Sequence, residues 1–300
     1  MRSLQSPIWQ KPIEMKRVNI VKLVIIATAV GVVGCSPFNK LLKLNDSEQM
    51  YHAAINYYHD GDFQHALQLF EELAPRYAST MRSDTIMYYT GCCFYKQGDF
   101  HTSGRIFDEY RSTYGRSPLL EDVEYMHAMG YYFSSPQPSR DQTTTLQAIR
   151  AIGEYMERYP SSPKMGICEM RLEELKNKLY DKSFINARTY YKTGRYKAAI
   201  IAFENALAEF PDTPHREEIL FLTLDASYRL ADNSLASLQV DRFLDTMDAY
   251  YNFISEFPES KHARAAERMQ RAAKRFLAKH NADADATEAE DAENNNQTIQ

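Results

Sequence analysis

The sequence is poor in glycine, has a single tryptophan and contains no long apolar run. Its 11 Gly and 12 Pro among 300 residues stand between periodic segments, which excludes a Gly- or Pro-rich low-complexity chain. The longest apolar run is LVIIATAVGVV, residues 23–33. A membrane-spanning helix needs about 20 apolar residues, so this run is too short to be one.

Motifs of the common enzyme classes are absent as well. The sequence contains no GxxxxGK[ST], HExxH, GxSxG or GxGxxG, each of which places a reactive or phosphate-binding group at a fixed spacing. The eight His are scattered without a ligand-like cluster of Cys or His, so we expect no metal and no cofactor. Acidic pairs such as Glu71-Glu72 are typical of solvated helix faces. We therefore expect a protein that is not an enzyme.

The charge is uneven at the two ends and nearly balanced between them. Residues 1–35 carry five bases against one acid, and residues 281–300 carry six acids and no base. Subtracting both ends from the 35 bases and 40 acids of the chain leaves 30 bases and 33 acids in residues 36–280. A nucleic-acid-binding surface needs a basic excess, so nucleic acid is excluded as a partner.

The N-terminal segment has the layout of a secretory signal. Lys16, Arg17 and Lys22 precede the apolar run, and Gly34 and Cys35 follow it; either Met1 or Met15 is the start. The stretch VVGC (32–35) resembles the lipobox of bacterial lipoproteins, with Val in place of the commonest Leu. The resemblance implies a signal peptide over 1–34, a covalent lipid on Cys35 and a lipidated linker over 35–46. Several acyl chains, at about 0.8 kcal/mol per buried methylene, anchor stably where one does not.

Residues beyond the lipobox predict where the protein resides and how its other cysteines and its C-terminal end behave. Among lipoproteins, Ser36 rather than Asp after the Cys implies transfer to the outer membrane, and we expect a periplasm-facing protein. Cys92, Cys93 and Cys168 are interpreted as small buried residues, since adjacent cysteines pair poorly with each other. The segment 281–300 has almost no apolar bulk and is predicted to be a disordered acidic tail.

The middle of the chain contains a repeated helical pattern. A small residue or Thr is followed by large apolar or aromatic residues four, seven and eleven positions later, which keeps one helix face. Five copies occur: Ala66/Phe70/Leu73/Tyr77, Ser103/Phe107/Tyr110/Tyr114, Ala148/Ile152/Tyr155/Tyr159, Ala199/Phe203/Ala206/Phe210 and Thr246/Tyr250/Phe253/Phe257. The pattern predicts the second helix of five helix pairs, in repeats spanning about 47–80, 81–117, 118–162, 180–213 and 216–260.

A first helix precedes each of these second helices. It is marked by Ala54, Gly91, Ala128 and Ala187, each followed three residues later by an aromatic, and less clearly by Ala226. The pairs resemble the tetratricopeptide repeat, a helix-turn-helix unit of 34 residues. We therefore predict an all-α superhelical solenoid of about five tetratricopeptide helix pairs over 47–280, closed by a capping helix. In repeats three and five the small residues of the two helices are eight residues further apart than in the other repeats. This predicts insertions in the turn between the two helices, at 134–141 and 232–239.

The first helices also carry a second, mostly aromatic stripe. Its members stand three residues before, or one, four or five residues after, the small residue: Tyr51, Ile55, Tyr58, Tyr88, Tyr95, Tyr125, Met129, Tyr132, Phe184, Arg188, Tyr191 and Lys192. We call these twelve residues the aromatic stripe. In tetratricopeptide solenoids this face lines the concave groove, and tyrosine, with a polar tip, suits a half-wet wall. A peptide-binding groove is one interpretation; filling of the space between repeats is the other.

A lipobox upstream of five such repeats resembles the BamD family, the tetratricopeptide lipoproteins of the outer-membrane β-barrel assembly machinery. The residues that carry the resemblance lie at 58–77, 131–143 and 190–218; Ser103-Gly104 and the acidic tail depart from it. The resemblance implies N-terminal repeats that bind unfolded outer-membrane protein clients and C-terminal repeats that dock on a BamA-like barrel protein. A different periplasmic scaffold lipoprotein for envelope or cell-wall assembly, or a glycan-binding lipoprotein, is the alternative.

Overall fold

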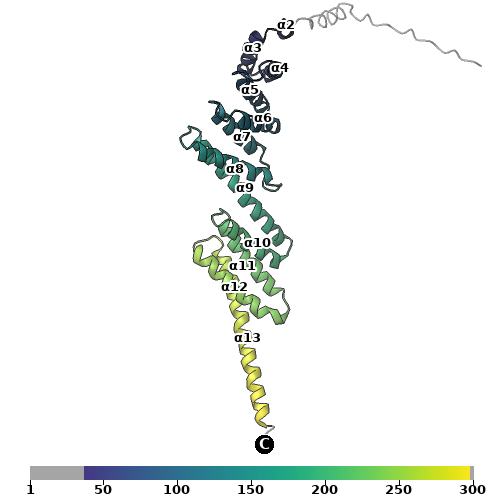
Figure 1. Cartoon of the computed structure of the whole chain (residues 1–300). Coiled ribbons are helices and arrows are strands. Elements are labelled where there is room, and N and C mark those ends of the chain that lie inside the picture. Colours follow the sequence, from purple (N-terminus) through teal and green to yellow (C-terminus); the bar gives the residue numbers. More distant parts are fainter. Residues whose placement is uncertain (1–36, 298–300) are drawn as a thin grey trace, which may run out of the picture. The chain divides into compact units, whose positions relative to one another are not determined.

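The computed structural model describes the backbone of residues 37–297 and the side-chain surroundings of residues 38–282. The predicted signal peptide, Cys35 and its lipid lie outside the described residues. Within them every regular element is a helix (Figure 1), which confirms the all-α prediction. The helices are α2 (Pro37–Leu44), α3 (Ser47–His59), α4 (Phe63–Leu73), α5 (Ser83–Lys96), α6 (Phe100–Thr113), α7 (Leu120–Ser134), α8 (Thr143–Arg158), α9 (Met165–Lys192), α10 (Tyr196–Glu209), α11 (Arg216–Asp232), α12 (Ala236–Glu256) and α13 (Ala263–Gln297).

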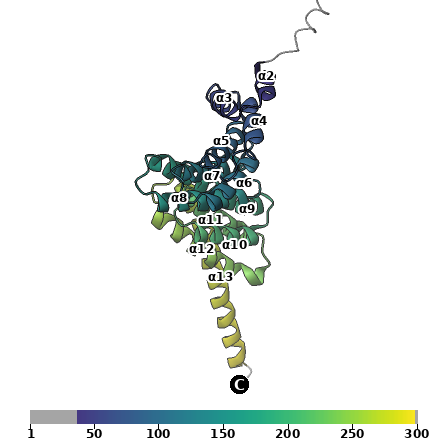
Figure 2. The ribbon, with the colours of Figure 1, turned by 45° about the horizontal axis from the view of Figure 1, so that its top comes forward.

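The chain divides into two compact units, Met1–Ile106 and Phe107–Gln300, with the boundary inside α6. In the first unit α3 packs on α4, and α4 packs on α5. In the second unit α7 packs on α8, and α9 to α13 follow one another side by side in chain order (Figures 1 and 2). The predicted tetratricopeptide pairs are therefore α3/α4, α5/α6, α7/α8, α9/α10 and α11/α12, with α13 as the closing helix.

Glycine forms the turn inside three of the pairs. Gly61, Gly98 and Gly194 have φ of 82°, 81° and 74°, the left-handed region that favours glycine. In each turn the glycine N–H and the N–H after it bond back to carbonyls of the preceding helix, for example Gly61 to Tyr58 at 3.2 Å and Asp62 to Tyr57 at 2.8 Å. These two hydrogen bonds end the first helix and reverse the chain within three residues.

Small residues allow the paired helices to approach closely. Ala54 and Ala66 are completely buried in the first unit, as Ala199 is in the second. In the α5/α6 pair the small residues are Gly91 and Ser103, and the Ser103 hydroxyl donates to the Gly91 carbonyl at 3.0 Å. Large side chains fill the space beside these contacts, for example Phe70, which stacks on Tyr89 with ring centroids 5.5 Å apart.

Two predicted boundaries are wrong. The linker 35–46 contains the helix α2, whose Phe38 is 5% exposed and packs against the His65 ring at 4.2 Å. Repeat four does not begin near 180, because α9 starts at Met165 and runs for 28 residues. No Gly or Pro stands between residues 167 and 192 to end it, and the buried Cys168 and Leu175 attach its first half to the preceding helices.

The two predicted insertions have different structures. Residues 135–142 form the loop expected between α7 and α8, and α9 holds it through Lys178, whose ammonium donates to the Ser135 carbonyl at 3.1 Å. The prediction of a turn insertion at 232–239 is wrong, because only residues 233–235 separate α11 from α12. The additional residues extend α12 at its N-terminal end to 21 residues.

The acidic segment also differs from the prediction. Instead of disorder after residue 280, α13 continues to Gln297 and extends beyond α9 to α12 of its own unit in both views (Figures 1 and 2). Its Ala and Glu residues have high helix propensity and continue a helix that is already nucleated. Among the described residues, no helix combines the length and the apolarity that crossing a membrane requires.

Candidate functional site

The aromatic stripe is distributed over α3, α5, α7 and α9, as the spacing predicts, but its members differ in exposure. Tyr51, Met129 and Phe184 are 9%, 2% and 5% exposed. These three side chains are core residues, so the prediction that they line an open groove is wrong. The remaining members are half-buried apart from the exposed Lys192: Ile55, Tyr58, Tyr88, Tyr95, Tyr125, Tyr132, Arg188 and Tyr191.

Three of the four aromatic residues that stand three positions before the small residue of a first helix are covered by a base from the next repeat; the fourth is Tyr88, after which Leu119 stands at the N-cap of the following first helix. The Arg82 guanidinium lies 4.6 Å from the Tyr51 ring centroid, and the Lys164 ammonium lies 4.9 Å from that of Tyr125. The ring of His215 stacks on Phe184 at 4.4 Å. Each base stands at the N-cap of the following first helix, so these rings connect consecutive repeats.

An acid one turn before each of these aromatics completes the contact. Glu48 accepts from Arg82 at 2.9 Å, Asp122 accepts from Lys164, and Asp181 bonds His215 at 2.6 Å. These acid–aromatic–base sets were not predicted from the sequence. The signal was present in the sequence as a recurring spacing. Each set has an acid, an aromatic residue three positions after the acid, and a base 34 or 42 positions after the acid.

Tyrosines four positions after the small residue also contact the next repeat. The Tyr191 hydroxyl donates to Asp225 at 2.5 Å, and the Tyr132 hydroxyl donates to Glu174 while Arg171 lies 4.8 Å from its ring centroid. Burial, and then the Asp225 carboxylate, raises the pKa of Tyr191 to about 12. These phenols are therefore neutral donors that bridge first helices. Tyr58 packs edge-on against Tyr89 at 4.9 Å.

A Ser or Thr forms the turn at every described junction between repeats. Its hydroxyl accepts from the N–H two residues later, at 3.2 to 3.3 Å for Thr80, Ser117, Ser162 and Thr213 and at 3.0 Å for Ser260. Such a turn satisfies one of the backbone donors left open at a helix start. This recurring residue is a structural element that the repeat pattern alone did not reveal.

A buried polar cluster lies between α6, α7 and α8. Glu124 is 6% exposed; it accepts a hydrogen bond from Arg158, and the Arg111 guanidinium is 3.5 Å away. His127, 7% exposed, has Nε2 3.1 Å from the Asp108 carboxylate, in a geometry that forms no hydrogen bond. Burial is the main cause that lowers the pKa of His127, and Asp108 opposes the shift.

The lowered pKa of His127 predicts that the folded protein loses stability in acid. Since the folded-state pKa lies below the ordinary value of about 6.5, the unfolded chain binds the proton more readily, and stability declines as the pH falls below about 6.5. We expect His127→Gln to make the free energy of unfolding less dependent on pH between about 7 and 5, measured by urea denaturation. His101→Gln, at an exposed position, is the control and should leave the pH dependence unchanged. An equal pH dependence in the wild type and His127→Gln would contradict this role.

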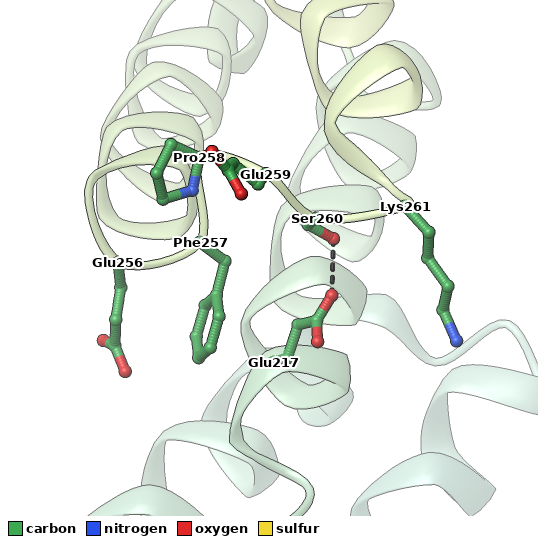
Figure 3. Close-up of a pocket in the computed structure, with 7 residues that line it drawn as sticks. All are labelled: Glu217, Glu256, Phe257, Pro258, Glu259, Ser260 and Lys261. Carbon is green, nitrogen blue, oxygen red and sulfur yellow. Dashed lines mark hydrogen bonds between the residues drawn. The ribbon is translucent and has the colours of Figure 1, made fainter.

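A hollow of about 520 Å³ lies between α10, α11 and α12. It includes Thr223 and Ser227, the positions in repeat five where the aromatic stripe stops. Three acids line it, Glu204, Asp245 and Asp248, and they were not predicted as a group because they come from two second helices. A second hollow of about 510 Å³ lies at the turn from α12 to α13 (Figure 3).

Neither hollow has the residues of a metal or nucleophile site. In the part of the chain that the structure describes, no three His, Cys, Asp or Glu side chains are grouped to hold a metal ion. Cys92, Cys93 and Cys168 are buried as predicted, and burial raises the pKa of the Cys93 thiol to about 12. A thiol with so high a pKa is a poor nucleophile at neutral pH.

Comparison with known proteins adds to this picture. A family model described as outer membrane lipoprotein, YfiO, matches residues 44–241. The outer membrane protein assembly factor BamD of Caulobacter vibrioides is 27% identical over 120 residues, which is 40% of this chain and 39% of that protein. The chain thus spans about two fifths of the length of the curated relative it matches. The TPR2AB domain of yeast Sti1, solved as a complex with pHSP90, aligns over 76% of this chain and 98% of its own with 12% identity and a TM-score of 0.35.

Proposed function

This chain belongs to the YfiO family of outer membrane lipoproteins, and from that membership we propose that it is a tethered scaffold for the assembly of outer-membrane β-barrel proteins. The family match over residues 44–241 carries the proposal, and the similarity to an assembly factor supports it. In the proposed arrangement a lipid on Cys35 holds the protein in the outer membrane, and the helix pairs face the periplasm.

The C-terminal repeats are the proposed docking site for a BamA-like barrel protein. The supporting observation is the exposure of large apolar side chains on and beside α12, where Leu235, Leu244 and Tyr251 are 75%, 50% and 50% exposed. Exposed apolar groups that gather on one element mark interaction surfaces in soluble domains. The N-terminal extension of α12 places Leu235 and Leu238 at the start of this helix.

The docking role is tested by affinity purification of the full chain from solubilised outer membranes. A barrel protein of the BamA type should copurify with it. Its absence, with the chain itself recovered intact, would contradict the proposal.

Client binding is proposed for the part of the aromatic stripe that remains accessible. On α9 the half-buried Tyr191 presents a ring edge, and Arg188 and Lys192 on the same helix add positive charge. An extended segment of an unfolded outer-membrane protein that ends in an aromatic residue and a carboxylate would match such a surface, with the rings packing together and the carboxylate meeting the bases.

The charged end of this surface provides a direct test. We expect the double variant Arg188→Gln/Lys192→Gln to bind a fluorescent peptide with a C-terminal phenylalanine carboxylate about tenfold more weakly, because a charge-assisted hydrogen bond contributes about 1.5–3 kcal/mol. The same peptide with a C-terminal amide should bind both proteins equally. Fluorescence anisotropy measures both affinities.

A matched control comes from two exposed bases at the next turn. Arg195→Gln/Lys197→Gln makes the same change in net charge at exposed positions outside the stripe and should bind the carboxylate peptide like the wild type. Equal losses in the two double variants would show a general charge effect and contradict a site at Arg188 and Lys192.

A further inference from the structure

The two hollows of the C-terminal repeats are similar in volume but differ in how their acids are partnered. At the α12–α13 turn the Ser260 hydroxyl donates to Glu217 at 2.6 Å (Figure 3), and Arg216 donates to Glu256 at 3.0 Å. These interactions connect α11 to the end of α12 and to the turn that leads into α13. The hollow at the turn is therefore a structural joint in which two of the acids, Glu217 and Glu256, already have partners.

The hollow between α10, α11 and α12 has no such compensation. Within the described residues, Glu204, Asp245 and Asp248 take part in no ion pair and no side-chain hydrogen bond, and all three are exposed. Since the other lining residues include no base, the three carboxylates give this opening an uncompensated negative charge.

The interior of this hollow is built differently from its acidic edge. Ile200, Leu207, Leu220 and Ala249 form walls of partly buried apolar side chains. Ser227 also lines the hollow; the residue is 5% exposed, and none of the side-chain hydrogen bonds of the described residues uses its hydroxyl. This hydroxyl is not among the buried polar atoms left without a partner, so its oxygen is open to the hollow and can bond an occupant that brings a hydrogen-bond donor or acceptor.

We propose that this hollow binds the side chain of an arginine or lysine presented by a partner protein. The aliphatic part of such a side chain packs on Leu207 and Leu220, and the cationic head meets the carboxylates and the Ser227 hydroxyl. Long basic side chains combine these two properties. A metal ion does not fit, because the acids are not grouped as metal ligands in the described part of the chain, and an apolar side chain would bring no charge to meet the three carboxylates.

The volume agrees with this occupant. About 520 Å³ lies within the range of pockets that enclose small ligands, about 300–1,000 Å³, and accommodates a basic side chain with its neighbours in an extended segment. The site goes beyond the proposed function, because none of its lining residues belongs to the aromatic stripe and its test requires no barrel protein.

The test uses the full chain and two labelled peptides. One is a pentapeptide of alternating leucine and arginine; the other has citrulline, a neutral group of the same shape, in place of each arginine. We expect fluorescence anisotropy to show about tenfold tighter binding of the arginine peptide, as one lost charge-assisted contact predicts. Equal affinities, a preference for the citrulline peptide, or no saturable binding of the arginine peptide up to millimolar concentration would overturn the proposal.

Two matched variants locate the binding. Asp245→Asn/Asp248→Asn should weaken binding of the arginine peptide about tenfold, whereas Glu209→Gln/Glu259→Gln changes net charge equally at exposed acids outside this hollow and should not. Equal weakening in both would reduce the effect to overall charge and overturn the site. In the wild type, the amide signals of Ser227 and Ala249 should shift on peptide addition in NMR spectra, and unshifted signals would also overturn it, independently of whether any variant folds.

Discussion

Phe203→Ala is expected to lower the free energy of unfolding by about 3–5 kcal/mol. Phe203 is completely buried on α10, where it packs with Phe184, Ala187 and Ile219 from the helices on either side. Truncation removes apolar area from the core and leaves a cavity that the alanines of the paired helices are too small to fill. Urea denaturation followed by circular dichroism at 222 nm measures the change.

A neighbouring residue on the same helix serves as the control. Ile201 is 51% exposed, so Ile201→Ala should change the free energy of unfolding by no more than about 0.5 kcal/mol. If both variants lost stability equally, Phe203 would not be the buried contact between α9, α10 and α11. The comparison also tests the tetratricopeptide register, because a shift by two residues along α10 exchanges the two positions.

Glu124→Ala is expected to destabilise the protein by about 3 kcal/mol. Glu124 is 6% exposed and lies between the guanidinium groups of Arg158 and Arg111, close to the buried His127. Removal of one partner from a buried charged pair leaves the other charge without compensation, which typically costs about 3–5 kcal/mol. We place the value at the lower end because Arg158 is 54% exposed and water reaches its guanidinium.

The control for this prediction is an exposed glutamate beside the same polar cluster. Glu154 pairs with Arg150 at 2.8 Å, and its side chain is 47% exposed. Glu154→Ala should cost less than about 1 kcal/mol, as surface ion pairs do. Denaturation curves that gave Glu154→Ala the larger loss would contradict a buried carboxylate at residue 124. Glu124→Gln should fall between the two, since the amide retains a hydrogen-bond acceptor.

The aromatic stripe shows how far periodicity leads and where it ends. Spacing correctly placed its members on the first helices. It did not distinguish Phe184, which is 5% exposed and stacks on His215, from Tyr95, which is half-buried. The difference depends on the base that the next repeat brings over the ring, which for Phe184 is His215, 31 residues later, and a helical period of 3.6 residues contains no information on that distance.

The hollow on repeats four and five could not be predicted from the sequence for a related reason. Its acids come from α10 and α12, and its buried hydroxyl comes from α11. On each helix these residues look like an ordinary solvated face. Only the packing of three helices side by side brings them to one opening, so the site exists in the tertiary structure alone.

The sequence by itself determined the all-α class, the five helix pairs and the glycine turns inside three of them, because small residues, apolar periods and turn residues act locally. It also led to the outer membrane lipoprotein family through the lipobox and the repeats. The tertiary structure decided the length of α9, the form of the second insertion, which rings are buried and where unpaired acids meet. These features depend on contacts between different helices, where burial and charge pairing, rather than local preference, determine the free energy.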